Sequence, residues 1–134
     1  MAEIHAARAR ALVGTRFRPQ GRDPAHGLDC VGVLLSAFEL PRDLVRSDYR
    51  LRGDYRVEIE QALRQRFRRI PARWRRPGDV MVLAVAEDQL HLGIASAAGF
   101  IHADARIGKV VETPGPPPWP ILSIHRRRAG KSRG

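Results

Sequence analysis

The sequence is poor in cysteine: its 134 residues include only Cys30. A single cysteine cannot form an internal disulfide, so the thiol is either a buried core side chain or a reactive group. The chain also lacks the closely spaced CxxC and HExxH pairs of common zinc sites. A metal would have to be held by the scattered residues Cys30, His91 and His102. We therefore expect no metal and no other cofactor.

Long apolar stretches are missing too. The longest, residues 80–86, is far shorter than the roughly 18 residues that a membrane-spanning helix needs. Residues 1–13 mix Glu3, His5 and arginines among alanines, without the apolar centre of a signal peptide. The sequence therefore predicts a soluble protein made in the cytoplasm, with no export signal and no membrane span.

Acidic residues are few beside basic ones. There are 14 Asp and Glu against 24 Lys and Arg, a formal net charge of +10. Such a charge favours binding to a polyanion, whether nucleic acid, an anionic cell-wall polymer or an acidic protein. We identify no aromatic residues interleaved with the basic ones and no zinc-finger or glycine-loop motif, which makes nucleic acid the less favoured partner. We interpret the charge as a solvated surface, with a basic, disordered tail over residues 126–134.

The rest of the composition is that of an ordinary globular domain, which we place at residues 1–125. Hydrophobic residues make up 43% and charged residues 28% of the chain. Ile4, Ala7, Ala11 and Leu12 share one face of a predicted first helix that ends at Gly14. Residues 14–29 then contain three glycines and two prolines, a density that predicts a loop.

A buried helix is predicted to begin at Cys30. Residues 30–38 are apolar on nearly every side, and Asp29 is a natural N-cap. A further helix is expected after Asp54, with Ile59, Leu63 and Phe67 facing inward. A turn at residues 77–79 opens a second half of short β-rich segments, at residues 80–86, 90–96, 100–104, 109–112 and 121–125. The pattern predicts an α+β fold with the cysteine helix packed on an antiparallel sheet.

The position of Cys30 has chemical meaning. At the first turn of a helix, the helix dipole and free backbone N–H groups lower a thiol pKa and can hold an oxyanion. An isolated cysteine in an apolar helix is usually inert, but the Asp-Cys pair, the glycine-rich loop and two downstream histidines favour a nucleophile. His91 interrupts an apolar strand, which favours a functional role; His102 is equally consistent with a core histidine. We expect His26 and His125 at the surface.

Three segments resemble the NlpC/P60 cysteine peptidases, which have a papain-like fold. They are LVGTRFRPQGRDPAHGLDCVG, which is similar to the family's cysteine motif, then PGDVMVL and HLGIASAAGFIHA, which are similar to its Gly-Asp and His-x-Gly-Ile strands. The resemblance implies Cys30 as nucleophile, His91 as general base and later acid, and His102 as the residue that orients His91. The order Cys before His fits this family, whereas the related lecithin-retinol-acyltransferase-like enzymes run His before Cys.

The resemblance also implies a substrate. The family hydrolyses peptide bonds in bacterial cell-wall stem peptides, typically between D-γ-glutamate and a diamino acid. Versions carried by phage tails and gene-transfer particles lack signal peptides and include some that read DCVG, as this chain does. That subgroup implies peptidoglycan stem peptides and phage-like tail proteins as partners, and action on the cell wall or within a particle.

The resemblance places Phe17, Asp29 and Val31 next to the substrate, and the chain departs from the family at Phe17, Val31 and Gln20. Phe17 stands where the family has a tyrosine whose hydroxyl assists catalysis, and Val31 replaces the serine that follows the nucleophile. Gln20 occupies the place of a common glycine. These departures leave open an alternative, a catalytically inactive binding or tail-assembly module that uses its basic surface. Asp29 is more naturally a helix cap than a catalytic acid.

Strand geometry decides whether the two histidines meet. On a hairpin, a turn centred on Ser96 and Ala97 makes His91 and His102 direct neighbours. A turn on Ala98 and Gly99, which composition favours, keeps them on one face but about 13 Å apart unless a bulge intervenes. We expect the Cys30 sulfur within a few ångströms of a His91 ring nitrogen. We also expect a groove floored by the sheet and walled by residues 14–28.

Overall fold

Antiparallel strands form the centre of the protein. The structure, a computed structural model, describes residues 2–45, 55–86 and 89–128. Its six-stranded sheet has the order β3-β8-β4-β5-β6-β7, and a two-stranded ribbon joins β1 to β2. The strands are β1 (Arg22–Asp23), β2 (Gly27–Leu28), β3 (Phe67–Ile70), β4 (Val80–Ala86), β5 (Gln89–Ala95), β6 (Gly99–Asp104), β7 (Lys109–Pro114) and β8 (Ile121–Arg127).

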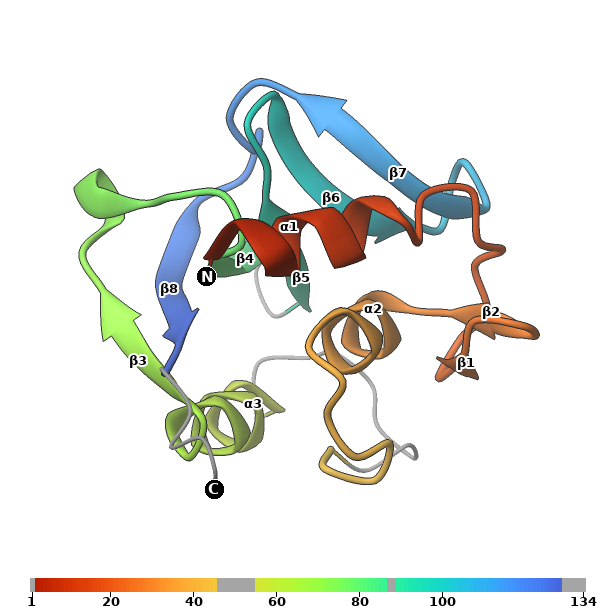
Figure 1. Cartoon of the computed structure of the whole chain (residues 1–134), viewed down its shortest axis with the longest axis horizontal. Coiled ribbons are helices and arrows are strands. Elements are labelled where there is room, and N and C mark those ends of the chain that lie inside the picture. Colours follow the sequence, from red (N-terminus) through yellow and green to blue (C-terminus); the bar gives the residue numbers. More distant parts are fainter. Residues whose placement is uncertain (1, 46–54, 87–88, 129–134) are drawn as a thin grey trace.

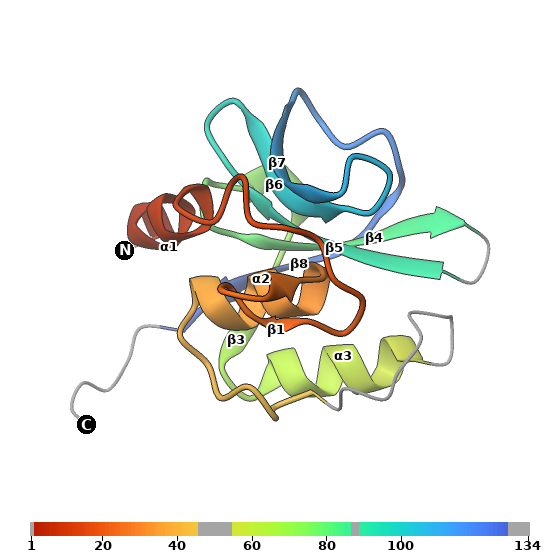
Figure 2. The same ribbon diagram turned by 90° about the vertical axis from the view of Figure 1, so that its right-hand side faces the viewer.

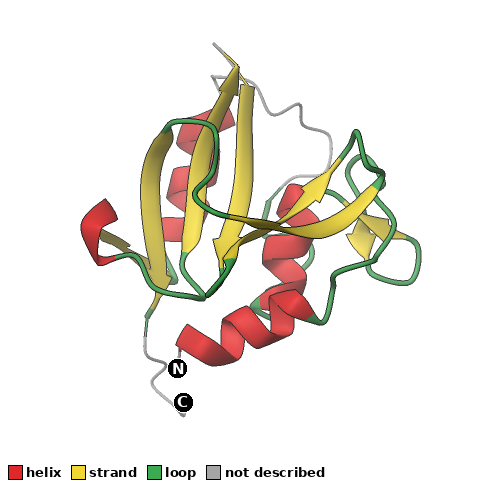
Figure 3. Cartoon of the chain, turned by 90° about the horizontal axis from the view of Figure 1, so that it is seen from above, coloured by secondary structure: helices red, strands yellow, loops and turns green. Residues whose placement is uncertain are grey.

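The helices come mainly from the first half of the chain. They are α1 (Ala2–Arg10), α2 (Cys30–Ala37), α3 (Tyr55–Arg64) and the short 3-10 helix η1 (Ala72–Trp74) (Figure 1). Figure 2 shows α2 and α3 on one side of β4 and β5, with the β6–β7 hairpin rising on the other. Seen from above, the strands cross over the helices (Figure 3). The predicted α+β fold is therefore confirmed.

Apolar side chains cover both faces of the sheet. On the helix side, Leu35 and Ile59 pack with Val82 and other residues in one buried cluster. On the opposite face, Met81, Leu83 and Phe100 belong to a second cluster, against which Trp119 packs. Both clusters exclude water from the sheet, so burial of apolar area on its two sides stabilises the strands that carry the site.

The cysteine helix forms as predicted. Asp29 is its N-cap, and every residue of α2 except Ser36 is buried. In α3, Ile59 and Leu63 are buried, as expected, whereas Asp54 lies outside the described residues. No helix in the described ranges is long and apolar enough to cross a membrane.

Other predicted elements need correction. Helix α1 ends at Arg10 and buries Ala6 and Ala9, while Ile4 is 48% exposed, because the buried face of this short helix is lined by small residues. Phe67 belongs to β3, which pairs with β8 and was not predicted because its Phe-Arg-Arg-Ile sequence does not alternate. Strand β8 also runs to Arg127, two residues beyond the end expected at residue 125.

Candidate active site

Cys30 is the first residue of α2 and is 4% exposed. The preceding Asp29 accepts a hydrogen bond from the Gly32 N–H at 2.8 Å, which satisfies one of the backbone donors that the first turn of a helix leaves open. The cap fixes where the helix starts. It therefore fixes where the thiol lies.

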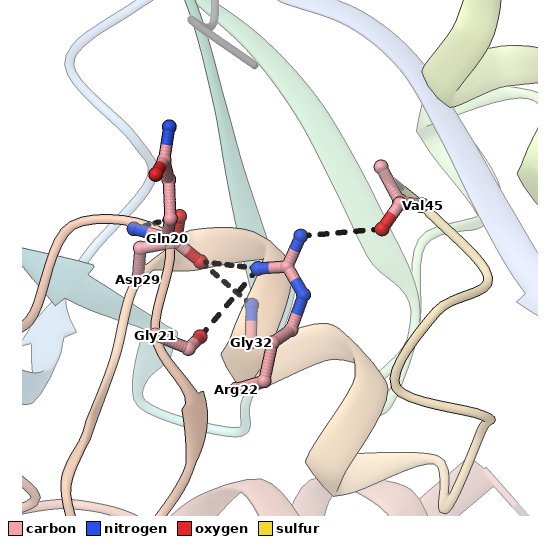
Figure 4. Close-up of polar contacts among 6 residues, drawn as sticks. All are labelled: Gln20, Gly21, Arg22, Asp29, Gly32 and Val45. Carbon is pink, nitrogen blue, oxygen red and sulfur yellow. Dashed lines mark hydrogen bonds and ion pairs between the residues drawn. The ribbon is translucent and has the colours of Figure 1, made fainter. Parts of the chain in front are cut away.

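The Asp29 carboxylate also ties the preceding loop to the helix (Figure 4). It accepts from the Gln20 N–H at 3.1 Å and from the Arg22 guanidinium at 3.3 Å. Arg22 reaches on to the carbonyl of Val45 at 3.4 Å. Asp29 is thus a structural cap, as predicted. Both of its carboxylate oxygens accept hydrogen bonds from the loop or the helix.

Gly32 allows this loop to lie directly on the helix. A Cβ at this position would be 2.2 Å from the carbonyl oxygen of Gly21, closer than real Cβ contacts. Any side chain at residue 32 would push the loop away from the cysteine helix. Packing against the loop therefore explains the glycine of the Asp-Cys-Val-Gly sequence.

His91 and His102 meet across the β5–β6 hairpin. Ile94 pairs with Ile101 and Ala95 with Phe100, so the turn is centred on Ala97 and Ala98. This register lies midway between the two that the sequence left open, and it makes the histidines diagonal neighbours on one face. Their side chains bridge the diagonal: Nε2 of His91 lies 2.8 Å from Nδ1 of His102.

Thr113 extends this pair into a chain of three side chains. Its Oγ1 lies 2.9 Å from Nε2 of His102, from the neighbouring strand β7. Thr113 was not predicted from the sequence, because only the pairing of β6 with β7 brings it beside His102. When Nε2–H of His91 donates to His102, Nδ1 of His91 keeps a free lone pair and can take a proton.

The Cys30 thiol reaches the sheet where β5 and β6 separate. The two strands pair only at Ile94 and Ala95, so Leu92 lies outside their ladder. The backbone N–H groups of Leu92 and Val31 are hydrogen-bond donors toward the Cys30 sulfur. The thiol therefore lies against the backbone of the residue that follows His91.

The expected lowering of the Cys30 pKa is wrong for this structure. Burial is the largest influence and raises the pKa, and the negative charge of Asp29 raises it further. The N–H groups of Leu92 and Val31 and the charge of Arg22 act in the opposite direction but do not outweigh burial. At neutral pH the resting protein carries a thiol.

Both histidines of the pair are also uncharged. Burial, reinforced by the neighbouring His102, lowers the pKa of His91 to about 4, against a smaller opposing influence of Asp104. Burial lowers the pKa of His102 as well. A neutral imidazole is the form that can accept a proton, so His91 is ready to act as a base across the physiological range.

A cavity of about 890 Å³ opens over these residues. Cys30, His91 and His102 all line it, so the structure brings the three predicted catalytic residues to one place. Its other lining residues come from the 17–20 loop, the cap of α2, strands β4 to β7, the 104–106 turn and the proline-rich connector between β7 and β8. They include Phe17, Gln20, Asp29, Gln89, Arg106, Thr113 and Trp119. The expected groove is present, and its loop wall is limited to Phe17, Pro19 and Gln20.

Contact between nucleophile and base stays a prediction. Among the hydrogen bonds of the described residues, none joins the side chains of Cys30 and His91. Both face the same cavity, and the Leu92 amide that approaches the sulfur follows His91 directly. Both side chains thus open onto the cavity, and their approach within hydrogen-bond reach is the part that stays a prediction.

The three positions expected to contact substrate differ in placement. Phe17 is half-buried and lines the cavity, without a hydroxyl to offer. Asp29 lines it too, although its carboxylate serves the cap and the loop. The Val31 side chain is fully buried in the core and is not part of the cavity wall, so Val31 can contribute only its backbone there. Gln20, with φ of 59°, holds a left-handed backbone at the rim.

The remaining histidines do not join the site. His26 is exposed, as expected, and lies 3.3 Å from Asp23. The prediction of a surface His125 is wrong: it is 6% exposed, and its Nε2 lies 2.8 Å from Ser123 Oγ. Strand β8 lies between β3 and β4, a strand order that the local sequence pattern does not record. Within the described part of the chain, no group of three His, Cys, Asp or Glu residues could hold a metal.

The fold of this chain is similar to that of several solved structures. No protein-family model matches the sequence, and no curated protein matches it either. Among solved structures, NlpC1 from Trichomonas vaginalis aligns with 94% of this chain and 44% of its own length, at TM-score 0.69 and 19% identity. This chain thus spans less than half the length of that protein.

Two mycobacterial structures are also similar. The P60 domain of a Mycobacterium avium subspecies paratuberculosis antigen covers 94% of this chain and 93% of its own, at TM-score 0.59 and 20% identity. The peptidoglycan hydrolase RipB from Mycobacterium tuberculosis covers 94% of this chain and 63% of its own, at TM-score 0.60 and 20% identity. The fold is therefore that of the NlpC/P60 domains.

Proposed function

We propose that the protein is a cysteine peptidase in which Cys30 is the nucleophile, His91 the general base and acid, and His102 the residue that orients His91. The observation that carries the proposal is the convergence of Cys30 and the hydrogen-bonded His91–His102 pair on one cavity. A nucleophile, a base and an orienting partner are the three parts that thiol hydrolysis needs.

The reaction begins from an uncharged pair. The Cys30 sulfur attacks the substrate carbonyl carbon while its proton passes to Nδ1 of His91. Nδ1 of His102 accepts a hydrogen bond from the Nε2–H of the resulting imidazolium. The C–N bond then breaks as His91 returns the proton to the leaving amine, leaving a thioester on Cys30. Water attacks the thioester, His91 takes its proton, and the sulfur leaves as a thiol together with the carboxylic acid product. The backbone N–H of Cys30 is the proposed donor to the intermediate oxyanion, because the next N–H groups of α2 already donate to the Cys30 sulfur and to Asp29.

The proposed substrates are bacterial cell-wall stem peptides, cleaved between D-γ-glutamate and a diamino acid. The NlpC/P60 fold, the motifs around Cys30 and His91, and the likeness to a peptidoglycan hydrolase support this class. The cavity of about 890 Å³ falls in the range that holds a short peptide. Gln20, Gln89 and Arg106 at its wall offer polar groups for peptide amides and carboxylates.

The finer proposal is that the chain works in a phage-like tail or gene-transfer particle. The Asp-Cys-Val-Gly form of the nucleophile motif supports it, because some versions in such particles share it. Co-purification of the chain with assembled tails is its test, and a chain found only free of particles counts against it.

Two observations favour the alternative, an inactive binding module. Phe17 provides no hydroxyl at the cavity, and burial raises the Cys30 pKa instead of lowering it. The difference between the two functions is turnover. An inactive module would bind stem peptides or tail proteins without cleaving them, and substitution of Cys30 would not weaken that binding.

The deciding experiment digests purified muropeptides with the wild type, Cys30→Ser and Cys30→Ala, and identifies the fragments by mass spectrometry. The proposal predicts a new diamino-acid amine and a new D-glutamyl γ-carboxylate with the wild type only. Loss of about 10³-fold or more in rate is expected for Cys30→Ala, since the covalent route is gone. Binding without cleavage by the wild type would establish the inactive module.

A further inference from the structure

Arginine is concentrated in the segment that carries β3 and η1. Residues 64–79 contain seven arginines and a single acid, Asp79. Six of these arginines are exposed. Five of them, together with an exposed tryptophan, form what we call the Arg–Trp patch: Arg68, Arg69, Arg73, Trp74, Arg75 and Arg76. Within the described part of the chain, none of these arginines makes an ion pair.

The one acid of this segment does not neutralise the patch. Asp79 is fully buried and binds the guanidinium of Arg126 through two hydrogen bonds of 2.8 Å. Arg126 also donates to the carbonyl of Trp74 at 2.9 Å, and the Arg76 N–H donates to Asp79 at 2.8 Å. The buried ion pair therefore anchors η1 to the sheet, so that the patch is presented in a fixed arrangement.

Trp74 is an exposed apolar surface within this charge. Its side chain is 58% exposed, and the Arg73 guanidinium lies 5.2 Å from the ring centroid. This corrects the sequence interpretation, which found no aromatic residue among the basic ones. Covering the indole ring on binding would remove its apolar area from water, which favours association. An exposed indole among arginines therefore indicates a binding surface more than a solvated one.

The patch and the cavity are formed by different elements. The patch occupies edge strand β3 and η1, whereas the cavity is lined from strands β4 to β7 and from the connector before β8. No residue of the patch lines the cavity. Figure 1 shows β3 and η1 on the left of the molecule and the β1–β2 loop, beside the start of α2, on the right.

We propose that the Arg–Trp patch is a docking surface for a phosphodiester-linked sugar–polyol polymer of the bacterial wall. This partner rests on the proposed function, since it places the enzyme beside its peptide substrate. Arginine forks match the paired oxygens of phosphodiesters, and an indole covers the apolar face of a sugar ring. Docking here leaves the cavity free for peptide.

Single-stranded nucleic acid fits the patch less well. Proteins that bind it stack successive bases on several aromatic side chains along a basic groove. Here Trp74 is the one aromatic side chain among the exposed patch residues, surrounded by groups that recognise phosphate alone. One aromatic side chain among several arginines matches a polymer that has many phosphates and few sugar rings.

The test measures co-sedimentation of Cys30→Ala protein with wall sacculi that carry a poly(ribitol phosphate) polymer, and with the same sacculi stripped of it by hydrofluoric acid. We expect at least tenfold weaker binding to stripped sacculi. The triple variant Arg73→Gln, Arg75→Gln, Arg76→Gln should lose about tenfold on intact sacculi and show a shallower salt dependence. Trp74→Ala should lose about threefold to fivefold, because one covered ring is lost.

A matched control carries the same change in charge elsewhere. Arg10→Gln, Arg16→Gln, Arg42→Gln alters exposed arginines outside both patch and cavity, and its binding should change less than twofold. On soluble muropeptides, the patch variants with Cys30 intact should keep the wild-type kcat/KM. If the wild type did not hydrolyse soluble muropeptides, the proposed function would be refuted. The docking proposal would still stand or fall by its own result, because sacculus binding is measured with the Cys30→Ala protein.

Several outcomes would overturn the docking proposal. Equal loss in the control and patch triple variants, with no effect of Trp74→Ala, would mean attraction by net charge only. An oligonucleotide could displace the protein from sacculi when its phosphate concentration equals that of the wall polymer. If it did so for the wild type but not for Trp74→Ala, nucleic acid would be the partner. Self-association of the patch variant with unchanged binding would mean that the arginines serve only to keep edge strand β3 from pairing.

Discussion

At the residue scale, burial sets the protonation of the candidate site. The Cys30 thiol and the His91 imidazole are both uncharged in the resting state, since burial raises the pKa of the first and lowers that of the second to about 4. Attack by Cys30 must therefore be coupled to proton transfer to His91. Preformed thiolate is not the resting nucleophile.

This protonation predicts the pH dependence of kcat/KM. The active form has neutral His91, so activity should fall on acidification through about pH 4, where His91 becomes charged. Because the thiol pKa is raised, no loss is expected on the alkaline side up to about pH 9. A stem-peptide assay across pH 3.5–9 checks the plateau. An acidic limb near the ordinary histidine value, about 6.5, would contradict the burial account.

The His91–His102–Thr113 chain predicts graded effects of substitution. His102→Ala should lower kcat by about 10- to 100-fold, because His91 loses the partner that fixes its ring, and His102→Asn should lower it less. Thr113→Val should cost about threefold to tenfold in kcat with little change in KM, the worth of one neutral hydrogen bond. Steady-state kinetics on one stem peptide measures all three. Wild-type kcat in His102→Ala would leave only a Cys30–His91 dyad.

At the scale of elements, the capped helix α2 and the diverging strands β5 and β6 position the site. The helix was predictable from sequence because the Asp29 cap and the apolar run after it are local signals. The diagonal placement of His91 and His102 was not, because a turn on Ala97 and Ala98 carries no glycine to mark it. Thr113 was hidden for a related reason: strand register is set by long-range packing, which local pattern does not record.

Asp29 offers a test of this element. Asp29→Ala removes the cap of α2 and the carboxylate bound to the part-buried Arg22, and should lower the free energy of unfolding by about 2–4 kcal/mol. Asp29→Asn keeps a capping oxygen and should cost less. Urea unfolding measures both. The exposed Asp43→Ala is the control, expected within about 0.5 kcal/mol of wild type. A similar small change in Asp29→Ala would show that the cap does not hold the helix.

At the scale of the whole molecule, buried neutral histidines make the fold sensitive to acid. His125 pairs with Val80 of the helix-facing core, and burial lowers its pKa to about 4, with Glu60 opposing and Arg69 adding to the shift. Its unfolded pKa is about 6.5, so the unfolded chain binds more protons between pH 6.5 and 4. Stability is therefore present at neutral pH and lost as pH falls through that window.

This linkage is measurable by urea unfolding at pH 7.5 and pH 4.5. The wild type should lose on the order of 1–3 kcal/mol more than His125→Gln over that interval, since glutamine does not titrate. His91 contributes in the same direction and remains in both proteins. If the free energy of unfolding had the same pH dependence in both proteins, the pKa of His125 would be the same in the folded and unfolded states, which would contradict the account.

The central claim, covalent catalysis by Cys30 in this cavity, is tested most directly by trapping its acyl-enzyme. An activated γ-ester of L-alanyl-D-glutamate should acylate the thiol quickly, so that hydrolysis of the thioester becomes the slow step. We expect a burst of one leaving group per protein molecule. Intact mass should rise by the mass of the acyl group, located by peptide mapping on Cys30, and the adduct should be absent in Cys30→Ala. Turnover of the ester without a burst or adduct, retained in Cys30→Ala, would contradict the account.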